Sequence, residues 1–369
     1  MDDQLKYYIA LTNVQGIGPV LARNLIRYVG SAEAIFHEKQ SLLEHISEIG
    51  PVRAKAICAA QTMQRAEQEL EFIQKHHIKA YCIGQPDYPY RLAECDDAPI
   101  VIYTSGNMTL NERHVLSVVG TRKPSDWGRE NCRRIISDLG KMLPDTIIVS
   151  GLAYGIDVTA HKAALEAGLQ TIAVPGHGLD RIYPAVHREV AVKMAQHGGI
   201  VTEFMSQTRP DRANFIQRNR IIAGLADATI VIESRTHGGS LITAADALSY
   251  GRDVMAVPGR IGDELAAGCN ALIKHNKAGL IESAADLLEQ LNWEPAATPQ
   301  PQQSELFTPL TPQQVQVVKL LRQSSDPIHI NDIAQTMQMT IAATSSLLLQ
   351  MEFNALVRSV PGGRYRALP

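Results

Sequence analysis

The chain has 369 residues, of which 45% are hydrophobic and 20% charged, and its formal net charge is -3; the length predicts two or three domains of ordinary globular composition. No apolar run approaches the roughly 20 residues that span a bilayer, and the acidic N-terminus lacks a secretory signal, so we expect a cytoplasmic protein without a membrane segment. The net charge excludes a basic surface over the whole molecule, so any nucleic-acid site must be local.

Residues 1–75 have the pattern of helices without strands, which predicts an N-terminal helical domain. Gly16-Ile17-Gly18-Pro19 fits a helix-hairpin-helix, in which a glycine turn joins two helices and points backbone N–H groups at a phosphate. The sequence Ile49-Gly50-Pro51 repeats part of this pattern. A small helical bundle that never contacts DNA explains the same residues equally well.

Residues 80–292 are expected to form the α/β core of the protein. An irregular stretch over residues 80–105 predicts a lead-in strand and loop. Six β-branched runs follow, each with a Gly-rich loop and then a helical segment after it: HVLSVVG, DTIIVSG, QTIAVPG, GIVTEF, ATIVIES and DVMAVPG. This alternation predicts a Rossmann-like, doubly wound, mostly parallel sheet with helices on both faces.

A linker and a small C-terminal domain complete the chain. Residues 293–311 are rich in Pro, Gln and Ser, which predicts an extended linker. Residues 312–369 begin with a capping box at Thr311-Pro312-Gln313-Gln314 and continue with two helical segments and a probable hairpin, the order of a winged-helix domain. Its expected recognition helix, TIAATSSLLLQME, carries no Lys or Arg, so we expect protein contacts or dimer adjustment rather than sequence-specific duplex binding.

The loops that follow the core strands suit an anion. They include Gly120-Thr121-Arg122, the stretch from Ser150 to Asp157, and the stretch from Ser234 to Ser240. Parallel strands bring such loops to one edge of the sheet, where helix N-termini also point. No dinucleotide fingerprint and no P-loop is present, and the second strand lacks a terminal acidic residue. We therefore expect no cofactor.

The segment RPDRANFIQRNR, residues 209–220, is the local basic region in this acidic chain, with four arginines and one aspartate. Arginine pairs with phosphates and stacks on bases, and Phe215 could stack on an unpaired base. Alternatively, the segment is a helix whose arginines bind nearby carboxylates and whose Phe215 and Ile221 face the core.

Catalytic and metal-binding roles have little support in the sequence. His161 follows Asp157 by four residues, but we expect Asp157 to be a helix N-cap and His161 to be a hydrogen-bonded structural residue. His177 and His237 receive the same interpretation. The five cysteines are scattered without metal-ligand spacing, so we expect buried, reduced thiols and no metal site.

With these motifs in view, the chain resembles the DNA-processing protein A (DprA/Smf) family over nearly its whole length. The most specific strings are VVGTRKPS, SGLAYGIDVTAHKAAL, RNRIIAGL and SRTHGGSLITAADAL. The resemblance implies binding of single-stranded DNA without sequence preference, protection of incoming DNA during natural transformation, loading of the RecA recombinase, a homodimer formed through the core, and no enzymatic activity.

The resemblance also implies a set of DNA-binding residues. Matching motifs place it at Gly120, Thr121, Arg122, Ser150, Gly151, Ala153, Gly155, Arg218, Asn219 and Arg220, to which we add Arg212, Phe215, Gly238, Gly239 and Ser240. The family commonly has proline after the aromatic residue, whereas this chain has Ile216, which leaves the position of the Phe215 ring open.

Two other functions remain as alternatives. The first is a nucleotide hydrolase of the phosphoribohydrolase type, whose Pro-Gly-Gly-x-Gly-Thr-x-x-Glu loop ends in a glutamate; the corresponding stretch here, HGGSLITAA, has none. The second is a transcription factor acting through the C-terminal domain, which the uncharged recognition helix argues against.

Overall fold

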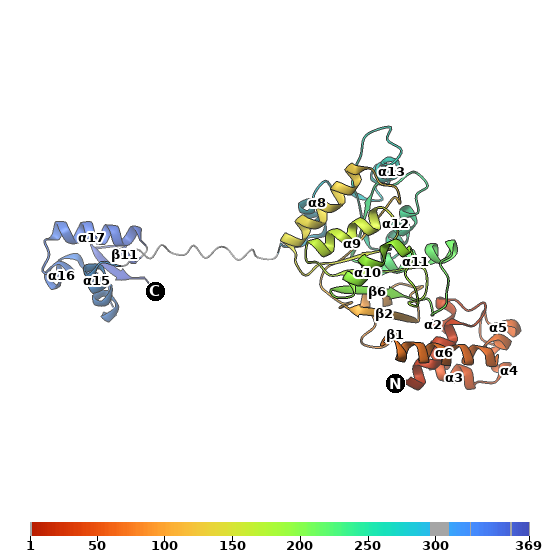
Figure 1. Ribbon diagram of the computed structural model, residues 1–369. Helices are drawn as coiled ribbons and strands as arrows, with labels where there is room; N and C mark the ends of the chain where they lie inside the picture. The colour runs from red at the N-terminus through yellow and green to blue at the C-terminus, as the bar shows by residue number, and fades with distance from the viewer. Residues whose placement is uncertain (1, 296–309, 325, 355, 369) are drawn as a thin grey trace. The chain divides into compact units, whose positions relative to one another are not determined.

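A computed structural model describes residues 2–295, 310–324, 326–354 and 356–368. The chain divides near residue 296 into two compact units. The first contains a nine-stranded sheet with helices around it, and the second is a small helical unit with a three-stranded sheet (Figure 1). Within the described residues, no helix combines the length and the apolar character needed to cross a membrane.

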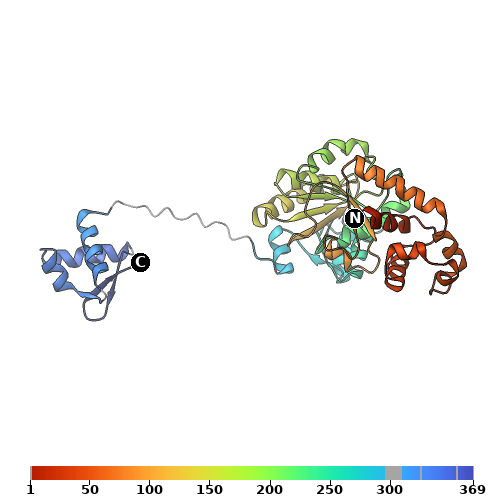
Figure 2. The same ribbon diagram turned by 90° about the horizontal axis from the view of Figure 1, so that it is seen from below.

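Six helices precede the sheet and gather in one body beside it (Figure 2). They are α1 (Asp2–Thr12), α2 (Pro19–Val29), α3 (Ala32–His37), α4 (Gln40–Leu43), α5 (Gly50–Ile57) and α6 (Ala60–Lys75). The turn between α1 and α2 contains Gly16, whose φ of 81° favours glycine. Arg53 of α5 donates through Nε to the Gly16 carbonyl at 2.8 Å. The second Gly-Pro motif therefore supports the first hairpin turn.

The strands of the first unit form one mostly parallel sheet in the order β1-β2-β6-β5-β4-β3-β7-β8-β9. Strands β3 to β9 pair in parallel, while β2 pairs antiparallel with both β1 and β6. The lead-in region thus supplies two strands instead of one. The strand bounds are β1 (Lys79–Cys82), β2 (Val101–Asn107), β3 (Val115–Gly120), β4 (Ile147–Ser150), β5 (Thr171–Ala173), β6 (Gly198–Thr202), β7 (Ala228–Ile232), β8 (Asp253–Ala256) and β9 (Gly279–Leu280).

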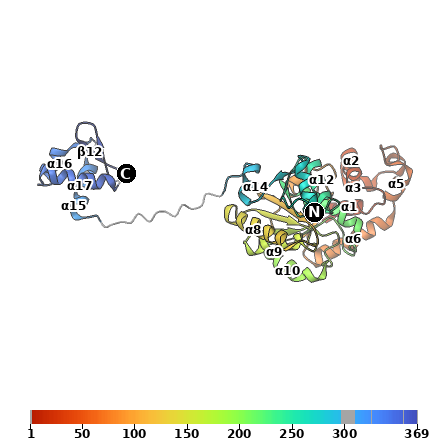
Figure 3. The same ribbon diagram turned by 90° about the horizontal axis from the view of Figure 1, so that it is seen from above.

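Helices cover both faces of the sheet, so the predicted doubly wound fold is confirmed. On one face, α8 (Asp126–Met142), α9 (Ile156–Glu166) and α14 (Ala284–Leu291) share a buried apolar cluster with the strands, and α10 (Arg188–Met194) follows them after the 3-10 turn Ala185–His187. The other face packs against α7 (Tyr90–Ala93), α11 (Arg212–Gly224), α12 (Ser240–Ser249) and α13 (Ala267–Lys274). Figure 3 shows α8, α9 and α10 on the side opposite α12.

The second unit has the predicted winged-helix elements. They are α15 (Pro312–Gln323), β10 (Ile328–His329), α16 (Ile330–Thr336), α17 (Ile341–Phe353), β11 (Val357–Val360) and β12 (Arg364–Ala367). Thr311 and Gln314 form the expected capping box, and Val317, Ile333 and Leu348 belong to its own buried core. Most of the predicted linker, residues 296–309, lies outside the described residues.

The cysteines follow their prediction with one exception. Cys82, Cys95, Cys132 and Cys269 are buried free thiols, whereas Cys58 is exposed. Cys58 directly follows α5 in the short turn before α6, where the chain runs over the surface. Its burial was therefore predicted wrongly.

Candidate nucleic-acid interface

A cavity of about 1160 Å³ lies where the winding of the sheet reverses. Strands β3 and β7 are neighbours, and the chain leads from β3 to β4, β5 and β6 on one side and from β7 to β8 and β9 on the other. The loops at the carboxyl ends of β3 and β7 line the cavity. Open α/β sheets bind their ligands at such a switch point.

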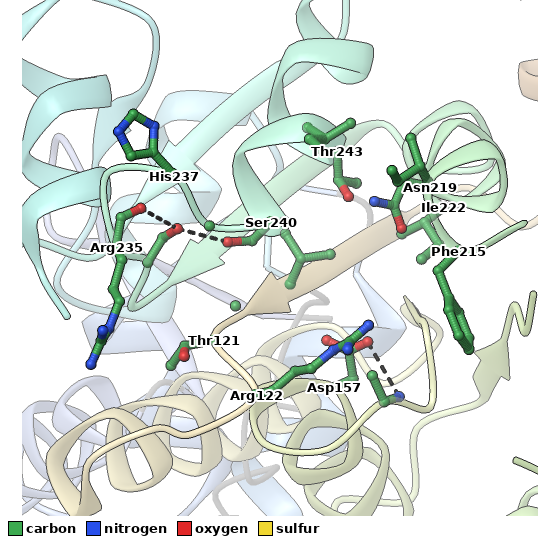
Figure 4. Close-up of a pocket in the computed structure, with 18 of the residues that line it drawn as sticks. Thr121, Arg122, Asp157, Phe215, Asn219, Ile222, Arg235, His237, Ser240 and Thr243 are labelled. Atoms are coloured by element: carbon green, nitrogen blue, oxygen red, sulfur yellow. Dashed lines mark hydrogen bonds between the residues drawn. The ribbon is translucent and has the colours of Figure 1, made fainter. Parts of the chain in front are cut away.

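The cavity brings together most of the predicted DNA-binding residues. Those that line it are Gly120, Thr121, Arg122, Ala153, Arg212, Phe215, Arg218, Asn219, Gly238, Gly239 and Ser240. Figure 4 shows Phe215 and Asn219 on one side, Arg235 and His237 on the other, and Arg122 reaching in between. Ser150, Gly151, Gly155 and Arg220 are not among the lining residues.

A buried carboxylate holds the loop that carries Arg122. Glu233 follows β7 and is only 2% exposed. Its carboxylate accepts hydrogen bonds from the backbone N–H of Ser125, at 2.8 Å, and from the Ser125 hydroxyl, while its carbonyl accepts the Thr121 N–H at 2.8 Å. The Ser125 hydroxyl in turn caps α8. Both ends of the loop are thereby fastened, which leaves the exposed Arg122 side chain on a rigid support.

The loop from Ser150 to Asp157 supports the cavity from below. Ser150 is fully buried and donates to the Val118 carbonyl at 2.6 Å. A side chain at Gly151 would collide with Arg218 and Asp157, and Gly155, with φ of 83°, passes against the Thr121 carbonyl. The two glycines let the backbone of this loop pass close to Thr121 and Arg218. Ser150, Gly151 and Gly155 therefore shape the wall of the cavity without lining it.

The structure corrects the expected role of Asp157. Gly155 is the N-cap of α9, and Asp157 is the second residue of the helix. The Asp157 carboxylate turns back to accept the Ala153 N–H at 3.4 Å. Burial raises the pKa of Asp157, and the nearby Arg218 guanidinium opposes that rise. The N-cap prediction was wrong because the helix begins at Ile156, whose N–H donates to the Thr121 carbonyl at 3.2 Å, and not at Val158.

Arg218 is a buried cation beneath the cavity. It is 3% exposed, and its Nη1 donates to the Val174 carbonyl at the end of β5. Burial lowers the pKa of Arg218 to about 10, and Asp157 counteracts this shift, so the side chain stays charged at neutral pH. Its Nε has no hydrogen-bond partner within the described part of the chain. Arg218 therefore supplies positive potential from inside the protein.

The ring of Phe215 lies among cations. The guanidinium carbons of Arg122 and Arg218 lie 5.6 Å and 5.8 Å from its centroid, within the range of cation–π attraction. Arg122 and Arg212 are exposed and line the cavity, and neither guanidinium donates a hydrogen bond to any described residue. Both side chains are free to bind a phosphate, and Arg122 lies beside an aromatic surface.

Arg220 points away from the cavity. Its Nη2 forms a buried ion pair with Glu203, and its Nη1 donates to the Asp97 carbonyl. For this arginine the structural alternative, a helix whose arginines bind neighbouring carboxylates, fits the geometry. The predicted group of arginines is thus divided between two sides of α11.

The N-termini of helices α9 and α12 lie beside the cavity. The N-cap residue of each helix is a glycine, Gly155 for α9 and Gly239 for α12, so neither helix has a side-chain cap. Residues beside both starts line the cavity. The positive end of each helix dipole favours an anion there, although the N–H groups of Ile156 and Val158 already donate to the Thr121 and Ala153 carbonyls.

Several lining residues were absent from the predicted set. They are Tyr183, Asp211, Arg235, Thr236, His237, Thr243 and Glu264 among others. Arg235 and His237 adjoin the predicted glycines in one loop, so their sequence position could have indicated them. Tyr183 follows a different Gly-rich loop, and only the tertiary structure brings it to Phe215.

His161 and His177 are buried and hydrogen-bonded as predicted, whereas His237 is exposed and lines the cavity, so its structural interpretation is not supported. His161 is fully buried and its Nδ1 contacts the Thr171 hydroxyl at 2.7 Å. That hydroxyl donates to the Ile148 carbonyl, so the His161 Nδ1 must donate. Among the described residues, no group of His, Cys, Asp and Glu side chains could hold a metal ion.

Comparisons with known proteins agree with this architecture. The family model of DNA recombination-mediator protein A matches residues 79–292, a DprA winged-helix model matches residues 295–363, and a SAM-like helix-hairpin-helix tandem matches residues 8–60. The chain belongs to the DNA recombination-mediator protein A family. The resemblance found in the sequence motifs is thereby confirmed.

Curated relatives of the family cover most of this chain. Protein Smf of Synechocystis is 32% identical over 98% of both chains, and DNA processing protein DprA of Streptococcus pneumoniae is 37% identical over 69% of this chain and 89% of its own. Among solved structures, DprA of Streptococcus pneumoniae aligns with 77% of this chain and 97% of its own at a TM-score of 0.63 and 32% identity. An experimental structure of the family therefore has the same fold as this chain over the aligned part.

A second solved structure concerns nucleic acid directly. DNA processing protein A of Helicobacter pylori, described for its single-stranded DNA binding mode, aligns with 59% of this chain and 97% of its own at a TM-score of 0.52 and 26% identity.

Proposed function

We propose that this protein binds single-stranded DNA in the cavity between β3 and β7, protects it, and passes it to the RecA recombinase during natural transformation or recombination. It would act as a homodimer in the cytoplasm, and without catalysis. The observation that supports the proposal best is the exposed Arg122 beside the Phe215 ring, with the exposed Arg212 in the same cavity, at the edge of the sheet where loops and helix N-termini collect.

The arrangement favours single strands over duplexes. Exposed arginines and backbone N–H groups attract phosphates of any nucleic acid, but an aromatic ring inside a cavity can stack only on a base that is not paired. The site thus has the two components of sequence-independent single-strand binding. The name of the Helicobacter pylori relative states the same ligand for that protein.

Titration of fluorescent oligo-dT and the matching duplex at two salt concentrations tests the proposal. We expect tight, salt-sensitive binding of the single strand and a marked loss in Arg122→Ala. Arg133→Ala is the matched control, because Arg133 is an exposed arginine on α8 outside the cavity. Equal affinity of wild type and Arg122→Ala would refute the assignment of the cavity.

The partner proposals have separate measurements. Light scattering of the purified protein gives the oligomeric state, and a mass of one chain at micromolar concentration would contradict the homodimer. RecA assembly on oligo-dT coated with a single-strand-binding protein should accelerate when this protein is added. No acceleration would leave DNA binding intact and remove the RecA role.

The hydrolase alternative keeps a direct assay. The stretch that corresponds to the glutamate-bearing loop runs through α12 and places Thr243 in the cavity. Incubation with nucleoside monophosphates should release no free base. Enzymatic release would reinstate that alternative and contradict the proposed absence of catalysis.

A further inference from the structure

Tyr183 is a second aromatic side chain in the cavity. It lies in the loop between β5 and α10, far in sequence from Phe215 on the first turn of α11. The two ring centroids are 5.9 Å apart with an interplanar angle of 35°. Both residues line the cavity.

The Tyr183 side chain is partly exposed to solvent. The residue is 46% exposed, and its hydroxyl forms no hydrogen bond with any residue that the structure describes. A buried structural tyrosine normally has a partner for its hydroxyl and packs its ring on the core. Neither applies here, so the fold gains little from an aromatic ring at this position.

The backbone of Tyr183 is nevertheless held firmly. Its N–H donates to Nε2 of the buried His177 at 3.2 Å, and His177 Nδ1 donates to the Gly178 carbonyl at 2.8 Å. The neutral tautomer of His177 is thereby determined. Burial lowers the pKa of His177, which keeps this acceptor available at neutral pH.

The N-terminal helices secure the same region. Glu69 of α6 is 2% exposed and binds the Ser206 backbone N–H at 2.8 Å and the Ser206 hydroxyl at 2.6 Å. The adjacent Gln207 N–H donates to Asp180 at 2.9 Å, close to Tyr183 in the loop. The segment from Ser206 continues into α11, which carries Phe215. The backbone segments that carry the two aromatic rings are therefore connected by one network of hydrogen bonds.

The Phe215 ring is positioned from the other side by Gly176. A Cβ atom at this glycine would lie 3.0 Å from Cδ1 of Phe215, so the ring packs directly over the backbone. The ring pair is neither offset-stacked nor edge-to-face, the two favoured arrangements. The contact between the two rings is therefore not one of the most favourable aromatic arrangements.

We propose that Tyr183 is a second base-stacking residue, which together with Phe215 holds two successive bases of one DNA strand. The proposal rests on the proposed function and adds a residue to its site. Each stacked base contributes about 1–3 kcal/mol to single-strand binding by alanine substitution. The arginines around the rings would meanwhile bind the phosphates that connect these bases.

The test compares Tyr183→Ala, Tyr183→Leu and Tyr183→Phe in the full-length chain by titration with fluorescent oligo-dT. The Ala and Leu variants should weaken binding roughly 5- to 150-fold, because both lack the ring. Tyr183→Phe should stay within about twofold, because the hydroxyl has no partner to lose. The salt dependence should be unchanged in all three, since stacking releases no counterions.

Tyr90→Ala is the matched control. Tyr90 is 48% exposed and its ring contacts the Arg91 guanidinium at 4.6 Å, but it does not line the cavity and lies in none of the loops around it. This variant should bind like wild type. If wild type binds and Arg122→Ala fails, yet Tyr183→Ala stays level with Tyr90→Ala, the stacking role of Tyr183 is refuted while the proposed function stands. If wild type does not bind at all, the proposed function fails first.

Oligonucleotides with one abasic position give an independent readout. Scanning that position through a short bound strand should reveal two adjacent sites where wild type loses affinity, one for each ring. Tyr183→Ala should become insensitive at one of them, and Phe215→Ala at the other. A single sensitive site in wild type, unaffected by Tyr183→Ala, would overturn the two-base arrangement.

Discussion

Helix α11 of the core and helix α17 of the winged-helix domain differ in what their exposed side chains can contact. Helix α11 carries Arg212, Arg218 and Arg220, although only Arg212 is exposed. Helix α17 has neither lysine nor arginine, and it exposes Ile341, Leu349 and Phe353, which are 56%, 55% and 84% exposed.

The contrast teaches that burial decides the role of a charge. Two of the three α11 arginines, Arg218 and Arg220, are buried, and only Arg212 lines the cavity with an exposed side chain. The three large apolar residues exposed on α17 are separated by eight and four positions, so they lie toward one side of the helix. An uncharged, partly apolar side is unsuited to a phosphate backbone.

The largest expected effect is the loss of stability in Arg220→Ala. Removal of the arginine leaves Glu203 buried without its ion pair, which costs about 3–5 kcal/mol of unfolding free energy. Urea unfolding followed by tryptophan fluorescence measures it, because Trp127 and Trp293 both lie in the first unit. Arg212→Ala, on the same helix, should be nearly neutral. Equal stability of the two variants would contradict the division of α11.

The next largest effect is on DNA affinity, where we expect Arg212→Ala, nearly neutral for stability, to have the larger effect of the two variants. A hydrogen bond to a charged group contributes about 1.5–3 kcal/mol, so Arg212→Ala should weaken oligo-dT binding about 10- to 150-fold. The slope of log affinity against log salt concentration should become smaller in magnitude by about 1, the value expected for one lost phosphate contact. Unaltered affinity and slope would show that Arg212 does not bind a phosphate.

A titratable group should follow the same rule of burial. Burial lowers the pKa of His161 to about 3. Below pH about 6.5 this histidine binds a proton in the unfolded chain but not in the folded protein. The free energy of unfolding should therefore decrease as the pH is lowered, by about 1 kcal/mol from pH 7 to 5.5. His161→Asn, which keeps a donor for Thr171, should lose this contribution.

The comparison between the wild type and His161→Asn is the measurement for that prediction. Burial raises the pKa of Asp246 to about 6, and a carboxyl with a raised pKa stabilises the fold as pH falls, in the opposite sense. This contribution cancels because both proteins contain Asp246. If the free energies of unfolding of the two proteins change with pH in parallel, His161 takes up a proton in the folded protein as readily as in the unfolded chain.

The smallest effect is expected from α17. Phe353→Ser changes an exposed side chain, so its stability should stay within about 0.5 kcal/mol, and its affinity for oligo-dT should match wild type. Selection from a random duplex pool should likewise yield no preferred sequence. A loss of affinity comparable to that of Arg212→Ala would instead bring the winged-helix domain into the DNA site.

Local patterns predicted the elements well. β-Branched runs followed by glycine loops identified six strands of the core, and the Thr311 capping box identified the start of α15. Such signals depend on neighbours in the chain. The pairing of β2 with β6 joins residues almost a hundred positions apart, and no local pattern carries it. The proposed domain boundaries near residues 75, 292 and 311 stay predictions.

By itself, the sequence determined the family, the doubly wound sheet and the loops that form the cavity, because glycine turns and apolar periodicity act locally. Only the tertiary structure decided which arginines face the cavity, and it alone placed Tyr183 beside Phe215 and Glu233 beneath the Arg122 loop. These arrangements depend on which side of each helix is buried and on contacts between distant segments.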